Sequence, residues 1–188
     1  MLDFWFGAPD TPEHGQPRAA WFKKSDAFDA EIRARFLPLY EAAARGEKET
    51  WARDAHGTLA LIVVLDQFPR NLFREGREAA RAYDTDPQAL ALARGLVASG
   101  ADRKLSTVER WFAYLPFEHA EELGAQREAL RLFTQLKEET GLAHALPWAQ
   151  KHYDVIARFG RFPHRNAMLG RASTDAEAEF LKEPGSRF

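Results

Sequence analysis

The hydrophobic positions of this chain recur mainly at helical spacing. The first clear case follows Asp26, whose side chain is suited to cap the first turn of a helix. Behind it, apolar residues return at steps of three and four and stop near Gly46: Phe28, Ile32, Phe36, Leu39 and Tyr40. This pattern predicts an amphipathic helix.

The most apolar stretch, residues 58–68, is ambiguous by periodicity. Its β-branched centre is compatible with a buried strand, but the sequence offers no second strand-like run to pair with it. We therefore predict a helix that is buried on all sides. It should end by Phe68, because Pro69 disfavours the helical conformation in the residue before it.

Capping residues and prolines predict further helices. Asp86 as N-cap with Pro87 behind it should begin a helix that runs to about residue 100. Ser106 and Glu109 form a capping box for a short helix that Pro116 should stop.

Three more helices are expected towards the C-terminus. The apolar pattern predicts them over residues 117–139 and 147–159, and a second capping box, Thr174 with Glu177, begins a short last helix. Six or seven helices with short links and no convincing strand indicate an all-α protein.

The chain has 188 residues, which is enough for one domain with a substantial core. We predict a single all-helical domain over residues 1–188. Residues 1–18 form its N-terminal arm and loop, in which the aromatic side chains of residues 4–6 dock on the body.

Charge and composition narrow the class of protein. The net charge of −2 argues against wholesale binding of nucleic acid or of anionic membranes. The longest apolar run, residues 59–65, is far shorter than the roughly 20 residues that span a bilayer. The first residues lack the basic segment of a secretory signal, and the absence of cysteine fits a reducing compartment. We expect a cytoplasmic protein.

Several polar groups fall on predicted apolar faces. His119, Glu122 and Gln126 continue the inward stripe of the helix predicted over residues 117–139. His152 shares a face with Trp148 and Ile156 in the next helix, and Asp66 lies in the most apolar helix of the chain. Because buried carboxylates and imidazoles are costly unless paired, these groups should meet partners across the fold.

Two stretches resemble each other and carry the matching partners. Residues 66–71 read DQFPRN, and residues 159–166 read FGRFPHRN. We interpret them as walls of one polar pocket. They supply the cations Arg70, Arg161 and Arg165 and the amides Gln67, Asn71 and Asn166. Gln126, from the helix predicted over residues 117–139, adds a fourth amide.

An excess of cations and amides over carboxylates favours an anionic small molecule as the ligand. In this hypothesis Arg70, Arg161 and Arg165 hold the anion. Asn71, Asn166 and Gln126 orient it, and Gln67 and His152 complete the ligand-binding set. His119 or His164 is the candidate for proton transfer, because imidazole titrates near neutral pH. Glu118 or Glu122 would orient that histidine, and Asp66 would fix an arginine. These residues are compatible with binding alone and with binding followed by turnover.

Other interpretations stay open. His119, Glu122, His152 and His164 are residue types that bind metals, but the Glu-x-x-His pair of di-iron bundles is absent, and we predict neither a metal nor a cofactor. The basic, aromatic stretch 151–171 would suit RNA, although its aromatics are better placed as anchors. The polar cluster is also compatible with a purely structural clasp, in which Asp66 and Glu118 or Glu122 pair with the arginines.

The motifs also carry a resemblance. The chain contains FWFG at residues 4–7, LDQFPRN at 65–71, LPFEH at 115–119 with Gln126 behind it, and RFGRFPHRN at 158–166 followed by LGR at 169–171. In these pieces, which extend over nearly the whole chain, it resembles the bacterial domain-of-unknown-function family 924. The resemblance implies a tetratricopeptide-like fold of stacked antiparallel helix pairs with a concave face. It carries over no catalytic residue. It supports a second hypothesis, a scaffold or adaptor that binds a peptide or protein partner on this face.

Overall fold

The computed structural model describes residues 1–187. Its regular elements in that range are all helices, and there is no strand. The all-α prediction is therefore confirmed. The α-helices are α1 (Leu2–Phe6), α2 (Asp26–Ala44), α3 (Ala55–Ile62), α4 (Phe68–Leu72), α5 (Asp86–Ala98), α6 (Thr107–His119), α7 (Leu123–Thr140), α8 (Leu146–Phe159) and α9 (Asp175–Phe180). Short 3-10 helices cover Ala19–Trp21, Glu49–Arg53, Ala79–Ala82, Ala101–Lys104 and Pro163–Arg165.

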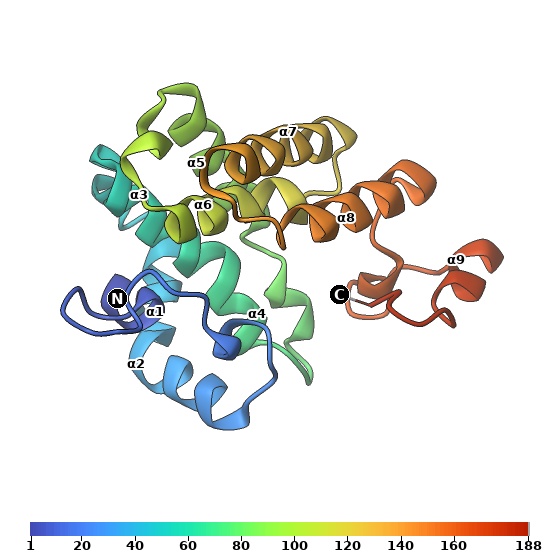
Figure 1. Ribbon diagram of the computed structural model, residues 1–188. Coiled ribbons are helices and arrows are strands. Elements are labelled where there is room, and N and C mark those ends of the chain that lie inside the picture. The colour runs from blue at the N-terminus through green and yellow to red at the C-terminus, as the bar shows by residue number, and fades with distance from the viewer. Residues whose placement is uncertain (188) are drawn as a thin grey trace.

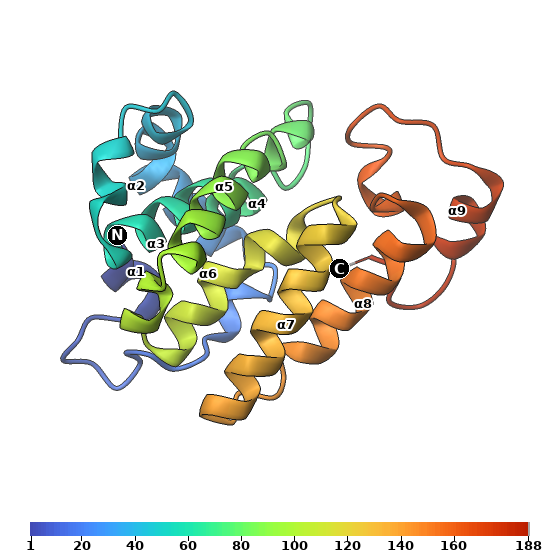
Figure 2. The same cartoon turned by 90° about the horizontal axis from the view of Figure 1, so that it is seen from above.

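The helices form two packed groups joined by α6 (Figure 1). In one group α2 packs on α4 and α3 packs on α5. In the other, α6, α7 and α8 lie side by side and alternate in direction (Figure 2). The segment with α9 extends beyond the end of α8. The tetratricopeptide-like arrangement stays a prediction.

The N-terminal aromatic residues anchor α1 in the core, as the sequence predicted. Trp5 and Phe6 are buried, and both pack edge-on against Phe112 of α6. Trp5 also contacts Trp21 and Phe68. This aromatic cluster fixes the loop before α2 against α4 and α6, where the site described below is formed.

The apolar stretch around residue 63 is a buried helix, as predicted, but it does not end at Phe68. Between α3 and α4 the chain makes a π-helical turn, Val63–Gln67, and the helix then continues through Pro69. Proline has no N–H to offer the carbonyl of Leu65, four residues earlier. The hydroxyl of Thr85 donates to that carbonyl at 2.5 Å. This distant partner supplies the donor that Pro69 lacks. The predicted end at Phe68 is wrong, because Phe68 keeps helical dihedral angles, φ −58° and ψ −38°, before the proline.

Pro116 does not stop a helix either. It is buried inside α6, which continues to His119, so the helix predicted over residues 117–139 is wrong at its start. The break falls at residues 120–122, and α7 begins at Leu123. The amide of Gln126 donates to the carbonyls of Glu118 and Ala120 at 2.7 Å each. These bonds satisfy the open end of α6 from the first turns of α7, a contact that no local pattern reveals.

Local capping is partly as predicted. Both capping boxes are present, at Ser106 with Glu109 and at Thr174 with Glu177. The cap of α2 is Ser25 and not Asp26, and α5 begins at Asp86 itself after Thr85. No helix in the part of the chain that the structure describes is long and apolar enough to cross a membrane.

Candidate functional site

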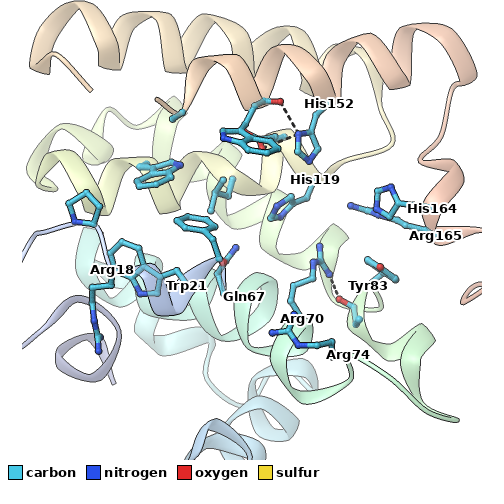
Figure 3. Close-up of a pocket in the computed structure, with 18 of the residues that line it drawn as sticks. Arg18, Trp21, Gln67, Arg70, Arg74, Tyr83, His119, His152, His164 and Arg165 are labelled. Carbon is cyan, nitrogen blue, oxygen red and sulfur yellow. Dashed lines mark hydrogen bonds and ion pairs between the residues drawn. The ribbon is translucent and has the colours of Figure 1, made fainter. Parts of the chain in front are cut away.

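A pocket of about 700 Å³ lies between the two groups of helices (Figure 3). Its size falls in the usual range of small-molecule sites. The lining comes from the loop before α2, the π-helical turn, α4, the end of the Ala79–Ala82 helix, α6, α8 and the Pro163–Arg165 helix. Among the predicted site residues it includes Gln67, Arg70, Glu118, His119, His152, His164 and Arg165. The structure thus brings together residues from both of the similar stretches.

At one end of the pocket two arginines share a carboxylate. Arg70 Nη2 donates to both oxygens of Asp86, at 2.8 and 2.9 Å, and Arg165 Nη1 donates to Asp86 Oδ2 at 3.3 Å. Both guanidinium groups also lie over the ring of Tyr83, at 4.7 and 4.6 Å from its centre. Arg70 makes a further hydrogen bond to the carbonyl of Ala82.

Arg165 has fewer hydrogen-bond acceptors around it than Arg70. It is buried, and its Nε atom has no hydrogen-bond partner within residues 1–187. Burial and the neighbouring charge of Arg70 lower the pKa of Arg165 to about 10. Burial also raises the pKa of Asp86, although both arginines favour its charged form. The guanidinium group of Arg165 lies over the rings of Tyr83 and Phe162, and its carboxylate contact within the described residues, at 3.3 Å, is to Asp86, which Arg70 already engages.

Beside the arginines, a carboxylate orients a histidine. His119 Nδ1 lies 2.7 Å from Oδ1 of the fully buried Asp66, whose other oxygen accepts from the amide of Gln67. Burial alone would raise the pKa of Asp66, but His119 and Arg70 outweigh it and hold the pKa below its usual value. Because an ionised carboxylate only accepts, Nδ1 of His119 donates to Asp66, and Nε2 is the ring nitrogen that this contact leaves open.

Glu118 contacts a different histidine, although it was predicted to orient His119 or His164. Its Oε1 lies 3.1 Å from His152 Nδ1, which is also 2.9 Å from the carbonyl of Trp148. Burial and the charge of Asp66 raise the pKa of Glu118 to about 8. Burial, with a contribution from His119, lowers the pKa of His152 to about 3. Near neutral pH both groups are therefore uncharged, and the contact is a close approach of two neutral groups.

His164 lies at the arginine end of the pocket (Figure 3). Burial and the charges of Arg165 and Arg70 lower its pKa to about 3, so its imidazole is neutral at physiological pH. Of the two histidines predicted for proton transfer, His119 lies 2.7 Å from a carboxylate oxygen, Oδ1 of Asp66.

The opposite end of the pocket is aromatic. Its lining includes Trp21, Phe22, Trp111 and Trp148. Phe22 is 60% exposed and Trp148 is 48% exposed, unusually high fractions for large apolar side chains. Trp148 was predicted to define the buried face of α8, but in the structure Val155 and Ile156 are buried on that helix, whereas Trp148 is about half exposed and lines the pocket.

Besides the buried Asp66, three predicted residues from the similar stretches lie outside the pocket lining. Asn71 donates to Asp29 at 2.7 Å. Arg161 pairs through two nitrogens with Glu177, and Asn166 accepts from Arg171 at 3.0 Å and donates to Ser173. Their side chains hold neighbouring segments together, so they belong to a clasp around the site.

The remaining two predicted residues also lie elsewhere. Gln126 is buried at the corner between α6 and α7. Glu122 pairs with Arg94 at 2.6 Å on the surface, with its side chain 57% exposed, because the break after α6 turns it away from His119. We leave both out of the candidate site.

Sequence reasoning missed the residues that complete the site. Asp86 was interpreted only as a helix cap, and Tyr83 and the aromatic wall of Trp21, Phe22 and Trp111 were not predicted. Because Asp86-Pro87 is typical of a helix start, capping alone explained the presence of the Asp86 carboxylate. Nothing in its spacing relates it to Arg165, 79 positions later. Within residues 1–187, no group of three or more His, Asp or Glu side chains is arranged to hold a metal ion.

Comparisons with known proteins agree with the architecture. Residues 1–185 match a family described as a bacterial protein of unknown function, DUF924. The fold is similar to the solved structure of a protein of unknown function from Agrobacterium tumefaciens, with 42% identity and a TM-score of 0.78 over 86% of this chain and 88% of that one. No curated protein matches the sequence. Because the match extends over nearly its full length, this chain belongs to the DUF924 family.

Proposed function

We propose that this protein binds an anionic small molecule, and that the anionic group contacts Arg165 and Arg70 beside Asp86. The observation that carries the proposal is the state of Arg165. It is a buried cation with an unpartnered Nε, a lowered pKa and a single carboxylate contact at 3.3 Å that it shares with Arg70. An incoming carboxylate or phosphate supplies the acceptors that Arg165 lacks, and planar guanidinium forks bind such groups in two-point contacts.

The pocket also holds a proton acceptor close to this centre. Arg70 Nη2 lies 3.8 Å from Asp66 Oδ1, the oxygen that contacts His119. A carboxylate that fixes the tautomer of a histidine is a common arrangement in general base catalysis. We infer that, if the bound molecule is turned over, His119 removes the proton and Asp66 positions it. A His119→Gln variant should then bind the anion with unchanged affinity and lose any turnover.

Thermal melting tests the binding proposal. The wild-type protein is heated with a panel of phosphates, carboxylates and nucleotides. A ligand at about a hundred times its dissociation constant adds about 2.7 kcal/mol, which raises the melting temperature by roughly 5–10 °C in a domain of this size. Arg165→Ala should abolish the shift. Arg165→Lys, which keeps the charge and is closer to the wild type in size, should reduce it, since it loses the fork.

Arg161→Ala is the matched control, because Arg161 comes from the same segment but pairs with Glu177 outside the pocket. It should change the melting temperature of the free protein without changing the ligand shift. A panel that produces no shift, or a shift that survives in both Arg165 variants, would contradict the proposal.

The second candidate is a helical scaffold that binds a peptide or protein. The exposure of Phe22 and Trp148 favours it, because exposed aromatic side chains often anchor partners. In that case Phe22→Ala and Trp148→Ala should weaken partner binding, while Arg165→Lys should leave it unchanged.

A further inference from the structure

We propose that the anion carries a planar aromatic group, which is seated on the aromatic wall formed by Trp21, Phe22, Trp111 and Trp148. This inference rests on the proposed function, because it places the anionic group at Arg165 and asks what the rest of the pocket accepts. The ligand class is then an aromatic phosphate ester or an aromatic carboxylate.

The pocket is divided along its length. Figure 3 shows Trp21 towards one end, Tyr83, Arg70 and Arg165 towards the other, and His119 between them. A ligand that reaches both ends must therefore combine an apolar part with an anionic group. Inorganic phosphate or acetate would use the arginine end alone and leave most of the 700 Å³ to water.

The ring geometry of the wall favours a flat partner. Trp111 packs edge-on against Trp21, with ring centres 6.3 Å apart, and is stacked with Phe22 at 5.2 Å. Because aromatic rings attract one another in stacked and edge-on arrangements, a further planar ring can extend this set. Phe22 and Trp148 keep 60% and 48% of their surface exposed, and Lys151 Nζ lies over the Trp148 ring, 4.3 Å from its centre.

The middle of the pocket does not oppose an apolar group. Glu118 Oε1 and His152 Nδ1 lie there 3.1 Å apart, and burial keeps both groups uncharged near neutral pH. Desolvating neutral groups costs much less than desolvating charges. Arg70 and Arg165 lie at the Tyr83 end of the pocket. Arg18 lies beside Trp21 (Figure 3), where its guanidinium group donates to the carbonyls of Phe4 and Trp5.

Calorimetric titration with matched probes tests the inference. One series compares inorganic phosphate, phenyl phosphate and cyclohexyl phosphate, and another compares acetate, phenylacetate and cyclohexylacetate. We expect the phenyl compound to bind about five- to twelvefold more tightly than the bare anion in the series whose anionic group is accepted, as ring contacts of about 1–1.5 kcal/mol imply. The cyclohexyl compound, similar in size but not planar, should bind more weakly than the phenyl one.

Variants assign the gain to the wall. Trp148→Ala should remove most of the advantage of the phenyl compound and leave the affinity for the bare anion unchanged. Leu123→Ala is the control, because Leu123 is also exposed, at 37%, but lies outside the pocket lining. It should change neither affinity. Arg165→Lys should weaken phenyl and bare anions alike.

The outcomes separate the two proposals. If the bare anion and its phenyl derivative bind equally and both need Arg165, the aromatic inference is overturned and the proposed function stands. Equal affinity of the phenyl and cyclohexyl compounds would also overturn it, because the wall would then select for apolar area and not for a planar ring. If neither series binds, the proposed function fails, and the aromatic inference fails with it.

Discussion

Replacing Asp86 with asparagine tests the proposed anion site at Arg70 and Arg165, because this one substitution removes the charge of the carboxylate that the two arginines share. The side chains of Asp86 and Arg165 are only 14% and 7% exposed. Removing one partner of a buried ion pair costs about 3–5 kcal/mol. Arg70 keeps the carbonyl of Ala82 and the nearby Asp66, so we expect the lower value, about 3 kcal/mol.

The expected loss is measurable. Each kcal/mol shifts the melting temperature of a domain of this size by about 2–4 °C, so Asp86→Asn should melt roughly 6–12 °C below the wild type. If the centre accepts anions, phosphate or acetate should raise the melting temperature of the variant more than that of the wild type. The added anion takes the place of the missing carboxylate between the two guanidinium groups.

A carboxylate outside the pocket provides the control. Glu121 pairs with Arg171 through both of its oxygens, and each side chain is 25% exposed. Glu121→Gln should cost less, about 1 kcal/mol, and anions should not restore it. The reasoning is refuted if Asp86→Asn costs no more than Glu121→Gln, or if anions restore both variants equally.

Three further predictions follow from the buried polar groups. Burial raises the pKa of Glu118 to about 8, whereas the same carboxyl in the unfolded chain loses its proton above about pH 4–5. The protonated Glu118 therefore stabilises the fold fully below about pH 4–5, and this stabilisation is lost as the pH rises to 8. Glu118→Gln should therefore flatten the fall in unfolding free energy between pH 5 and 8, measured by urea denaturation. Thr85→Val should lower the unfolding free energy by about 1–3 kcal/mol, because it leaves the Leu65 carbonyl unsatisfied opposite Pro69; a Pro69→Ala background, which returns an N–H, should reduce that cost. Gln126→Leu removes both bonds that close the end of α6 and should cost about 2–3 kcal/mol, whereas a cost below about 0.5 kcal/mol would show that water satisfies those carbonyls.

The fold class was readable from the sequence because its signals are local. Capping boxes at Ser106 and Thr174 join side chains three residues apart, and the structure contains both. The errors at Pro69 and Pro116 have the opposite cause. Proline removes one hydrogen bond from a helix, and opposite Pro69 the carbonyl of Leu65 is satisfied by Thr85, 20 positions away. Pro116 lies buried inside α6, a packing that its neighbours in the sequence do not indicate.

Only part of the candidate site could be predicted from the sequence, for a similar reason. Residues 66–71 and 159–166 have similar sequences, yet their residues have different roles. Arg70 and Arg165 line the pocket, while Asn71 and Asn166 make hydrogen bonds to neighbouring segments. Sequence indicates which side chains are polar and buried, but their partners follow from three-dimensional packing. Asp86 shows the limit clearly, since its role as a shared counter-ion depends on a contact with a residue 79 positions away.

A crystal structure of the protein soaked with phenyl phosphate and phenylacetate tests the central claim most directly. We predict an anionic group within hydrogen-bond distance of the Arg165 and Arg70 guanidinium groups, beside Asp86, with its ring directed towards Trp21 and Trp148. An anion bound elsewhere on the molecule, with the Arg165 end of the pocket filled only by water, would contradict the account.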